Sequence, residues 1–409
     1  MAASKLDDYE PIVGSGVIEE LRMLAENASH KTIKMVNSTA VGGGVAEILI
    51  KLVPLINQAG VSAKWDVIKG DDKFFSVTKA FHNALHGKEE EIDQKMLDTF
   101  LEYNRRNSAD MRFDEDVVVI HDPQPAALIE MKEKTKAKWI WRCHIDVSSP
   151  DPLVWDYLET YIRRYDASIF SSSKFARHLP IPQFIISPSI DPLSDKNKEL
   201  TRETIDKVLE KYGISKDKPI ITQISRFDAL KDPIGVIGGY ELAKEYADCQ
   251  LVLAGGGASD DPEAAKILEE VRQRAGSDED IHILDMPPFS DIEINALQRA
   301  SAIVVQKSLK EGFGLTVTEA LWKNKPVIAG AVGGIPLQVK HNRTGLLVYS
   351  VEGLAYQIRY LLRHPDIGER LGICGHEYVK RKFLLTRNLK DYLLLIIASD
   401  GLGESIIDA

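Results

Sequence analysis

Two carboxylates and two glycines stand close together between Gln306 and Trp322, in the stretch QKSLKEGFGLTVTEALW. The apolar residues 302–305 before it predict a buried strand, and residues 315–322 have the spacing of a helix. Ligands of open α/β sheets bind beyond the carboxyl ends of the strands, where free N–H groups at the start of the next helix attract phosphate. The order of strand, glycine loop and helix therefore predicts a diphosphate site at this loop.

The two carboxylates of this stretch predict contacts to different parts of one ligand. Gly312 and Gly314 interrupt the helix, so Glu311 belongs to the loop and Glu319 to the helix. A carboxylate accepts hydrogen bonds from neighbouring hydroxyls, and sugars and riboses present such pairs. We expect Glu311 to bind a hexose and Glu319 a ribose. The alternative is a solvated loop acid and a first-turn acid favoured by the helix dipole.

The spacing of these carboxylates, with Gly-Phe-Gly-Leu between them, resembles the Glu-x7-Glu signature of the family 4 retaining glycosyltransferases. Three further segments, HDPQP (121–125), WRCHID (141–146) and QISRFD (223–228), resemble the trehalose glycosyltransferring synthases of that family. The resemblance extends from Thr32 to Leu346. It implies the α/β fold called GT-B, in which two Rossmann-like domains face a cleft and the C-terminal helix crosses back to the first domain.

A basic pair follows the predicted strand 219–224. Arg226 can bind two phosphate oxygens at once and Lys231 adds a compact charge, so together they could neutralise a departing nucleoside diphosphate. The alternative is two solvated loop cations. The pair resembles the Arg/Lys pair of the family, and the resemblance also implies donor contacts from the two glycine loops, at Gly43, Gly44, Gly312, Phe313, Gly314, Leu315 and Glu319.

Polar residues also end two predicted strands of the first half, 116–120 and 138–141. By resemblance, His144 contacts the transferred sugar and helps to offset charge during bond breaking. We expect Asp122 and Arg142 to bind the hydroxyls of the acceptor, although they could instead pair with each other. His121 could simply cap backbone groups at its strand end.

The length of 409 residues, with 44% hydrophobic content, allows two domains of about 200 residues. We predict an N-terminal acceptor-binding domain over residues 1–187, completed by about 386–409. Residues 188–385 are then the nucleotide-sugar-binding domain. The segment 188–192 contains two prolines and is predicted to be the linker.

Charge and composition exclude several classes. A net charge of −10 argues against a nucleic-acid partner. No apolar run approaches 18 residues, and three dispersed cysteines give no zinc spacing, so we expect a cytoplasmic protein without a membrane span. We expect no obligatory cofactor and no metal site, although Mg²⁺ carried by the diphosphate could assist. The acidic triplet 114–116 is predicted to be a solvated turn, and a homodimer is possible.

The expected reaction joins glucose from a nucleoside diphosphate glucose to free glucose, giving trehalose reversibly. Retention is implied by the family, and we expect a front-face displacement in which a donor phosphate oxygen accepts the acceptor proton. A retaining trehalose phosphorylase and, in another class, a non-catalytic sugar or nucleotide sensor remain alternatives. A glycosidase and a nicotinamide dehydrogenase fit the motifs less well. The sequence leaves the nucleobase open.

Overall fold

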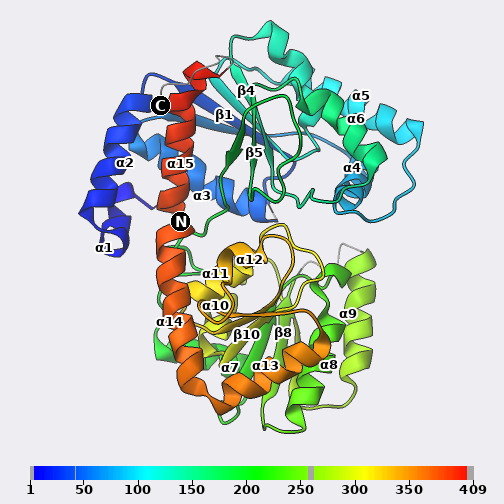
Figure 1. The fold of residues 1–409 in the computed structure, drawn as a ribbon, viewed down its shortest axis with the longest axis vertical. Coiled ribbons are helices and arrows are strands. Elements are labelled where there is room, and N and C mark those ends of the chain that lie inside the picture. Colours follow the sequence, from blue (N-terminus) through cyan, green and yellow to red (C-terminus); the bar gives the residue numbers. More distant parts are fainter. Residues whose placement is uncertain (1–3, 42, 257–261, 403–409) are drawn as a thin grey trace. The chain divides into compact units, whose positions relative to one another are not determined.

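The computed structural model describes residues 4–41, 43–256 and 262–402, and the chain divides into two compact units. The first unit comprises the residues up to Ser189 together with those from Leu385 onward, and the second runs from Ile190 to Leu384. Each unit contains one six-stranded sheet in which all paired strands are parallel, with helices on both faces (Figure 1). The predicted α/β class with two Rossmann-like sheets is confirmed, and the last helix belongs to the first unit.

The sheet of the first unit has the strand order β2-β1-β3-β4-β5-β6. The order reverses between β1 and β3, and such a reversal leaves a crevice at the carboxyl ends of the two strands. The elements of this unit are η1 (Leu6–Tyr9), α1 (Glu10–Val13), α2 (Ser15–Ala28), β1 (Thr32–Asn37), α3 (Gly44–Ala59), β2 (Ser62–Val67), α4 (Asp72–Leu85), α5 (Gln94–Asp110), β3 (Val117–His121), η2 (Ala126–Lys134), β4 (Lys138–Cys143), α6 (Pro152–Ile162), β5 (Ala167–Phe170), β6 (Gln183–Ile185), α15 (Leu385–Ala398) and η4 (Ser399–Gly401).

Alternation along the strands sends large side chains of the first sheet into one hydrophobic cluster. Val118 and Ile120 of β3 are the register partners of Trp139 and Trp141 in β4, and all four are buried there. Because strand side chains alternate between faces, the next partners along the strands lie on the opposite face. Among the helices of this unit, α15 packs against α2 and α3 (Figure 1). Segments from both ends of the described chain therefore belong to one unit.

The sheet of the second unit has the order β12-β11-β10-β7-β8-β9, which reverses between β7 and β10. Its elements are α7 (Arg202–Lys211), β7 (Ile220–Ile224), η3 (Ala229–Lys231), α8 (Pro233–Lys244), β8 (Gln250–Gly255), α9 (Pro262–Ala275), β9 (Ile281–Asp285), α10 (Asp291–Ala300), β10 (Ile303–Gln306), α11 (Leu315–Trp322), β11 (Val327–Gly330), α12 (Ile335–Gln338), β12 (Leu346–Val348), α13 (Val351–Arg363) and α14 (Pro365–Lys382).

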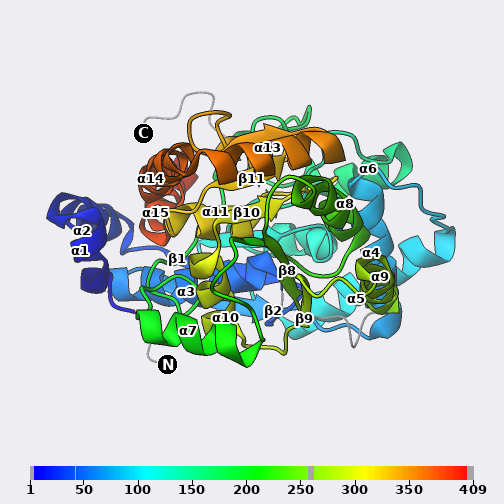
Figure 2. The same ribbon diagram turned by 90° about the horizontal axis from the view of Figure 1, so that it is seen from below.

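The two faces of this second sheet carry separate hydrophobic clusters. Leu251 and Leu253 of β8 pack with residues of α8 and α13, whereas Val252 and Ala254 pack with residues of α7 and α10. Figure 2 shows these two helix layers on opposite sides of β8 and β10. A strand buried on both faces has no polar alternation, which is why its sequence is a continuous apolar run.

One local prediction is wrong. The acidic triplet does not form a solvated turn, because Glu115 is buried beside Lys64 at 2.8 Å and Lys34 at 3.6 Å. Asp116 accepts hydrogen bonds from the backbone N and the Oγ1 of Thr32, both at 2.8 Å. These carboxylates fasten the amino ends of β1 and β3 together.

Among the helices of the described ranges, none is long and apolar enough to cross a membrane.

Candidate active site

In the second unit, the sequence-predicted acid and lysine meet at the reversal of the strand order. Lys231 ends the short η3 turn that follows β7, and Glu311 lies in the loop that follows β10. The two strands are neighbours in the sheet. Both side chains therefore come from the position where open α/β sheets bind ligands.

The contact between them is direct. Lys231 Nζ lies 2.6 Å from Glu311 Oε2, and Ser308 Oγ donates a hydrogen bond to the same oxygen at 3.1 Å. Their side chains are only 19% and 10% exposed, respectively. Each charge offsets the cost of burying the other.

Backbone contacts hold Lys231 in place. The Asp228 side chain caps the η3 turn by accepting from Leu230 N at 2.7 Å, and Leu230 O accepts from Leu309 N at 2.8 Å. Gln223 Nε2 donates to Lys231 O at 3.1 Å. The loops after β7 and β10 are thus joined, which fixes the ammonium relative to the acidic loop.

The glycines between Glu311 and the helix are required by close packing. Gly314, at the N-cap of α11, has φ +85°, and a Cβ on Gly334 would lie 2.4 Å from Gly312 O. The ring of Phe313 is buried, and Gln338 Nε2 donates to its carbonyl oxygen. After this packed loop, α11 begins at Leu315. The backbone N–H groups in the first turn of a helix have no acceptor within the helix, and the helix dipole favours an anion there.

Glu319 lies one turn into α11 and is 1% exposed. Its Oε1 is 3.9 Å from Lys196 Nζ. Lys323, one turn further, donates to Asn197 Oδ1 at 3.0 Å, Gln298 Oε1 at 2.8 Å and Glu319 O at 3.2 Å. Burial lowers the pKa of Lys323 to about 7, although Glu319 opposes that shift.

Arg226 differs from its neighbours because its side chain is 69% exposed and lies 3.6 Å from Asp228 Oδ2. The backbone around Arg226 is tightly packed, since a Cβ on Gly255 would lie 1.7 Å from Ser225 O. An exposed guanidinium on a tightly packed loop, paired with Asp228 only at 3.6 Å, is suited to bind an anion.

In the first unit, the glycine loop after β1 and Asp122 after β3 lie at the strand reversal, whereas Arg142 and His144 lie at the end of the next strand, β4. The loop after β1 reaches Gly43, the N-cap of α3, with φ +79°; Gly44 is the first residue of that helix, and Gly42 lies outside the described residues. A Cβ on Gly43 would meet nothing within 4 Å, so its backbone conformation, not crowding, favours glycine.

Asp122 follows β3 in the left-handed conformation, with φ +66°. Its N–H donates to Arg142 O at 2.7 Å, and its Oδ1 accepts from His144 N, also at 2.7 Å. Burial raises the pKa of Asp122 to about 7, although the His144 N–H and the charge of Arg142 oppose the rise. Asp122 and Arg142 therefore contact each other through the backbone and form no ion pair in the described structure.

Arg142 is register partner to His121 in the neighbouring strand and is 1% exposed. Its Nη2 donates to Ser171 Oγ at 3.3 Å, whereas its Nε and Nη1 have no hydrogen-bond partner in the part of the chain that the structure describes. His121 Nδ1 lies 3.0 Å from His144 Nε2. A buried cation and two imidazoles thus converge at the strand ends.

Metal-ligand clusters are not formed by the described residues, in which no three His, Cys, Asp or Glu side chains gather at a distance suited to an ion. Of the three free cysteines, Cys143 and Cys249 are buried and Cys374 is exposed.

Comparison with protein families gives two matches that between them cover most of the chain. Residues 35–177 match the family model described as trehalose synthase, N-terminal domain, and residues 204–377 match that of glycosyl transferases group 1. The trehalose synthase of Thermococcus litoralis is 44% identical over 398 residues, covering 96% of each chain. The chain belongs to the trehalose synthase family.

Two more distant proteins, one of known structure, are also similar to this chain. A solved trehalose-6-phosphate synthase, OtsA, superposes with a TM-score of 0.74 at 12% identity, over 92% of this chain and 100% of that one, which shows the shared GT-B fold. The trehalose phosphorylase of Pleurotus pulmonarius is 29% identical, over 84% of this chain and 54% of its own. This member of the trehalose synthase family is thus a GT-B glycosyltransferase of trehalose metabolism.

The trehalose synthase family member brings its predicted residues together within each unit. Lys231, Glu311 and the 312–315 loop form one group, whereas Asp122, Arg142 and His144 form another. Sequence reasoning missed Lys323, whose position four residues after Glu319 was the available signal. It also missed Ser308 and the His121–His144 contact, which depend on register and loop geometry.

Proposed function

We propose that this chain transfers a glucosyl group from a nucleoside diphosphate glucose to the anomeric hydroxyl of free glucose, giving α,α-1,1-linked trehalose. The observation that carries the proposal is the Lys231–Glu311 contact of 2.6 Å at the strand reversal of the second unit. It presents an ammonium and a carboxylate side by side, as a ligand with a diphosphate next to a polyhydroxylated ring requires.

We assign the following roles to the predicted residues. Glu311 binds hexose hydroxyls, Glu319 the ribose, and Arg226 with Lys231 the diphosphate. The glycine loop and the first-turn amides of α11 add N–H donors to the phosphates. From the first unit, His144 contacts the transferred sugar, Asp122 and Arg142 bind the acceptor, and Gly43 and Gly44 lie against the donor.

In the proposed step, the bond between the anomeric carbon and the diphosphate oxygen breaks, and a bond to the acceptor O1 forms on the same face. The acceptor hydroxyl proton passes to a donor phosphate oxygen, and the nucleoside diphosphate leaves. Arg226 and Lys231 stabilise the negative charge that develops on it. The protein supplies alignment and charge rather than a nucleophile.

The test is to incubate the protein with glucose labelled at C1 and, in turn, adenosine, uridine and guanosine diphosphate glucose. We expect ¹³C NMR to show α,α-trehalose, and Arg226→Ala to reduce its formation at least about 100-fold while thermal unfolding is unchanged. Absence of trehalose with every donor would refute the proposal. Near-normal turnover of Arg226→Ala would refute the role of Arg226.

A trehalose phosphorylase is the second candidate, favoured by the 29% identity to such an enzyme. Its substrate, inorganic phosphate, would bind to the same Arg226 and Lys231. Glucose 1-phosphate formed from trehalose and phosphate without nucleotide would support it. Binding of a nucleotide sugar without turnover of any donor would instead indicate a sensor.

We further propose that no protein-bound metal takes part, because Arg226 and Lys231 supply positive charge at the diphosphate. Protein treated with a chelator and desalted is expected to keep at least half of its turnover. Loss of activity that Mg²⁺ restores would contradict this proposal.

A further inference from the structure

His121 and His144 face each other in the geometry of a hydrogen bond between their rings. Nδ1 of His121 and Nε2 of His144 are 3.0 Å apart, the ring centres are 5.3 Å apart, and the ring planes differ by 16°. The separation of the centres equals the nitrogen–nitrogen distance plus one ring radius on each side. The rings therefore meet edge to edge, almost in one plane, with both nitrogens on the line between the centres.

Both imidazoles are neutral. Burial lowers the pKa of His121 to about 3 and that of His144 well below its ordinary value, and the charge of Arg142 acts in the same direction on both. A neutral imidazole carries one N–H and one lone pair. One ring therefore donates and the other accepts, and the choice fixes the proton on both.

The surroundings of His121 decide between the two choices. Its Nε2 is buried and has no hydrogen-bond partner among the described residues. A buried N–H without an acceptor is rarer and more costly than an unused lone pair. Arg142, the register partner of His121, also places a positive charge nearby, which disfavours an N–H and favours a lone pair. Both considerations favour the tautomer of His121 with its proton on Nδ1.

We propose that His121 is a positioning residue: by donating from Nδ1 to His144 Nε2, it holds His144 in the tautomer with its proton on Nδ1. His144 then presents an N–H, not a lone pair, to its ligand. The inference rests on the proposed function in taking the sugar as that ligand. An N–H can donate a hydrogen bond to a hydroxyl oxygen of that sugar and so fix its position.

The tautomer can be measured without any reaction. Protein with ¹⁵N-labelled histidine is examined by long-range ¹H–¹⁵N correlation, and the His144 signals are assigned by their loss in a His144→Gln variant. We expect wild-type His144 to carry its proton on Nδ1, and His121→Phe to shift it toward Nε2. His121→Asn, whose amide can place a donor near the position of Nδ1, is expected to restore the wild-type pattern at least in part.

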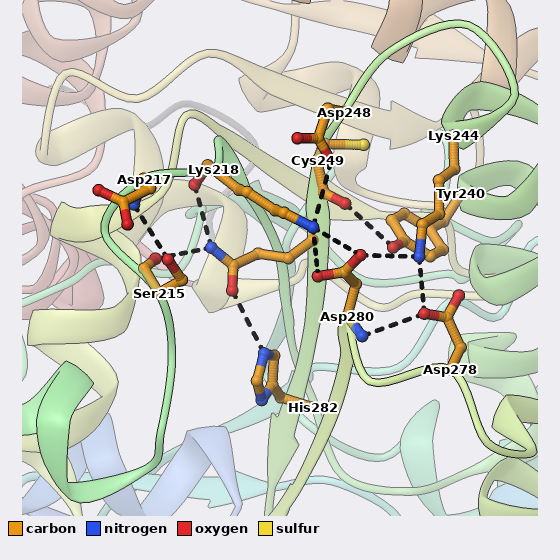
Figure 3. Close-up of polar contacts among 11 residues, drawn as sticks. Ser215, Asp217, Lys218, Tyr240, Lys244, Asp248, Cys249, Asp278, Asp280 and His282 are labelled. Atoms are coloured by element: carbon orange, nitrogen blue, oxygen red, sulfur yellow. Dashed lines mark hydrogen bonds and ion pairs between the residues drawn. The ribbon is translucent and has the colours of Figure 1, made fainter.

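Turnover gives the second readout. His121→Phe is expected to lower kcat about 10- to 100-fold with little change in KM, and His121→Asn to recover most of the loss. The matched control is His282→Phe. His282 is half-buried at the amino end of β9 and contacts Gln250 Oε1 through Nε2 at 3.2 Å (Figure 3). His282, like His121, is an imidazole with a hydrogen-bond partner, but it lies away from the carboxyl ends of the strands. The kcat of the His282→Phe variant should therefore stay within about twofold of wild type.

Two results would overturn the inference: a wild-type His144 protonated on Nε2, or a folded His121→Phe variant with unchanged tautomer and kcat. If His121→Phe does not fold, the wild-type spectrum decides alone. If the Nδ1 tautomer is found but no trehalose is formed from any donor, the proposed function fails while the assigned hydrogen bond stands.

Discussion

At the scale of single residues, the Lys231–Glu311 pair shows how two opposite charges can both be largely buried at one site. Each group offsets the burial of the other, with Ser308 adding a hydrogen bond to the same carboxylate oxygen. A phosphate that approaches Lys231 competes with Glu311, and hydroxyls that approach Glu311 compete with Lys231. A ligand that carries both groups satisfies both side chains at once.

Glu311→Gln tests this pair. Loss of the carboxylate leaves Lys231 without its counter-charge, so we expect the free energy of unfolding to fall by about 1–3 kcal/mol and turnover to fall at least about 100-fold. Urea titration and a trehalose assay measure the two effects. The control is Glu203→Gln, which removes an exposed pair with Lys207 and should change stability by less than about 0.5 kcal/mol. Equal effects in the two variants would contradict the assigned coupling.

Asp122→Asn tests the buried carboxyl group of the first unit. Because burial raises the pKa of Asp122 from 3.8 to about 7, wild type loses stability as pH rises through this interval, where the unfolded chain has already released the proton. Asn accepts the same His144 N–H and tolerates positive φ. The variant should match wild type near pH 4 and exceed its stability by about 1–3 kcal/mol near pH 8.

Urea titrations of both proteins across pH 4–8 measure this difference. A gap between the two free energies of unfolding that is constant with pH would contradict the raised pKa. Trehalose formation should meanwhile fall in Asp122→Asn, since the proposed acceptor contact loses its charge. A more stable but less active variant would separate the role of Asp122 in function from its role in folding.

At the scale of elements, the loop before α11 is shaped by backbone contacts that leave no room for side chains. Gly334→Ala would place its Cβ 2.4 Å from Gly312 O and 2.8 Å from the Cα of Phe313. The glycine loop must then shift, and we expect at least a tenfold loss of kcat/KM with about 1–3 kcal/mol of destabilisation. Steady-state kinetics over a donor series and thermal unfolding measure both.

Gly353→Ala in α13 is the matched control. The nearest atom to its added Cβ would be Ser350 Oγ at 3.5 Å, an ordinary contact, and its backbone is helical. The variant should be as active as wild type and up to about 1 kcal/mol more stable. A similar loss of activity in both variants would mean that the loop geometry is not what matters.

The elements themselves could be predicted where the pattern is local. The spacing of residues 315–322 alone predicts a helix, and these residues form α11 with those bounds. The prediction of a solvated turn for the acidic triplet is wrong because the partners of Glu115, Lys34 and Lys64, lie on strands distant in sequence. Lys323 does have a local signal, its position four residues after Glu319, but its contacts with Asn197 and Gln298 form only in the folded unit. The His121–His144 contact depends on strand register, which hydrophobic pattern leaves undetermined for polar strand ends.

At the scale of the whole molecule, the first unit is completed by the last helix. Leu393 of α15 is fully buried, whereas its neighbour Leu394 is 43% exposed. Leu393→Ala should cost about 2–5 kcal/mol, and Leu394→Ala less than about 0.5 kcal/mol. Hydrogen exchange should show lost protection in α2 and α3, with which α15 packs, and unchanged protection in α8 and α13. Equal loss in both units would show that they unfold together.

The chain passes between the units at two points that lie side by side. Ile190 N donates to Phe383 O at 2.9 Å, and Ile190 forms a parallel bridge with Leu384. The second unit is therefore an insertion within the first, and all of its strands have been made once Leu384 has left the ribosome. The first unit lacks the packing of α15 against α2 and α3 until α15 has also left the ribosome. The strands of the first unit are synthesised earlier, yet the first unit is the later of the two units to have all its elements available. This is the reverse of the usual order, in which the N-terminal domain folds first.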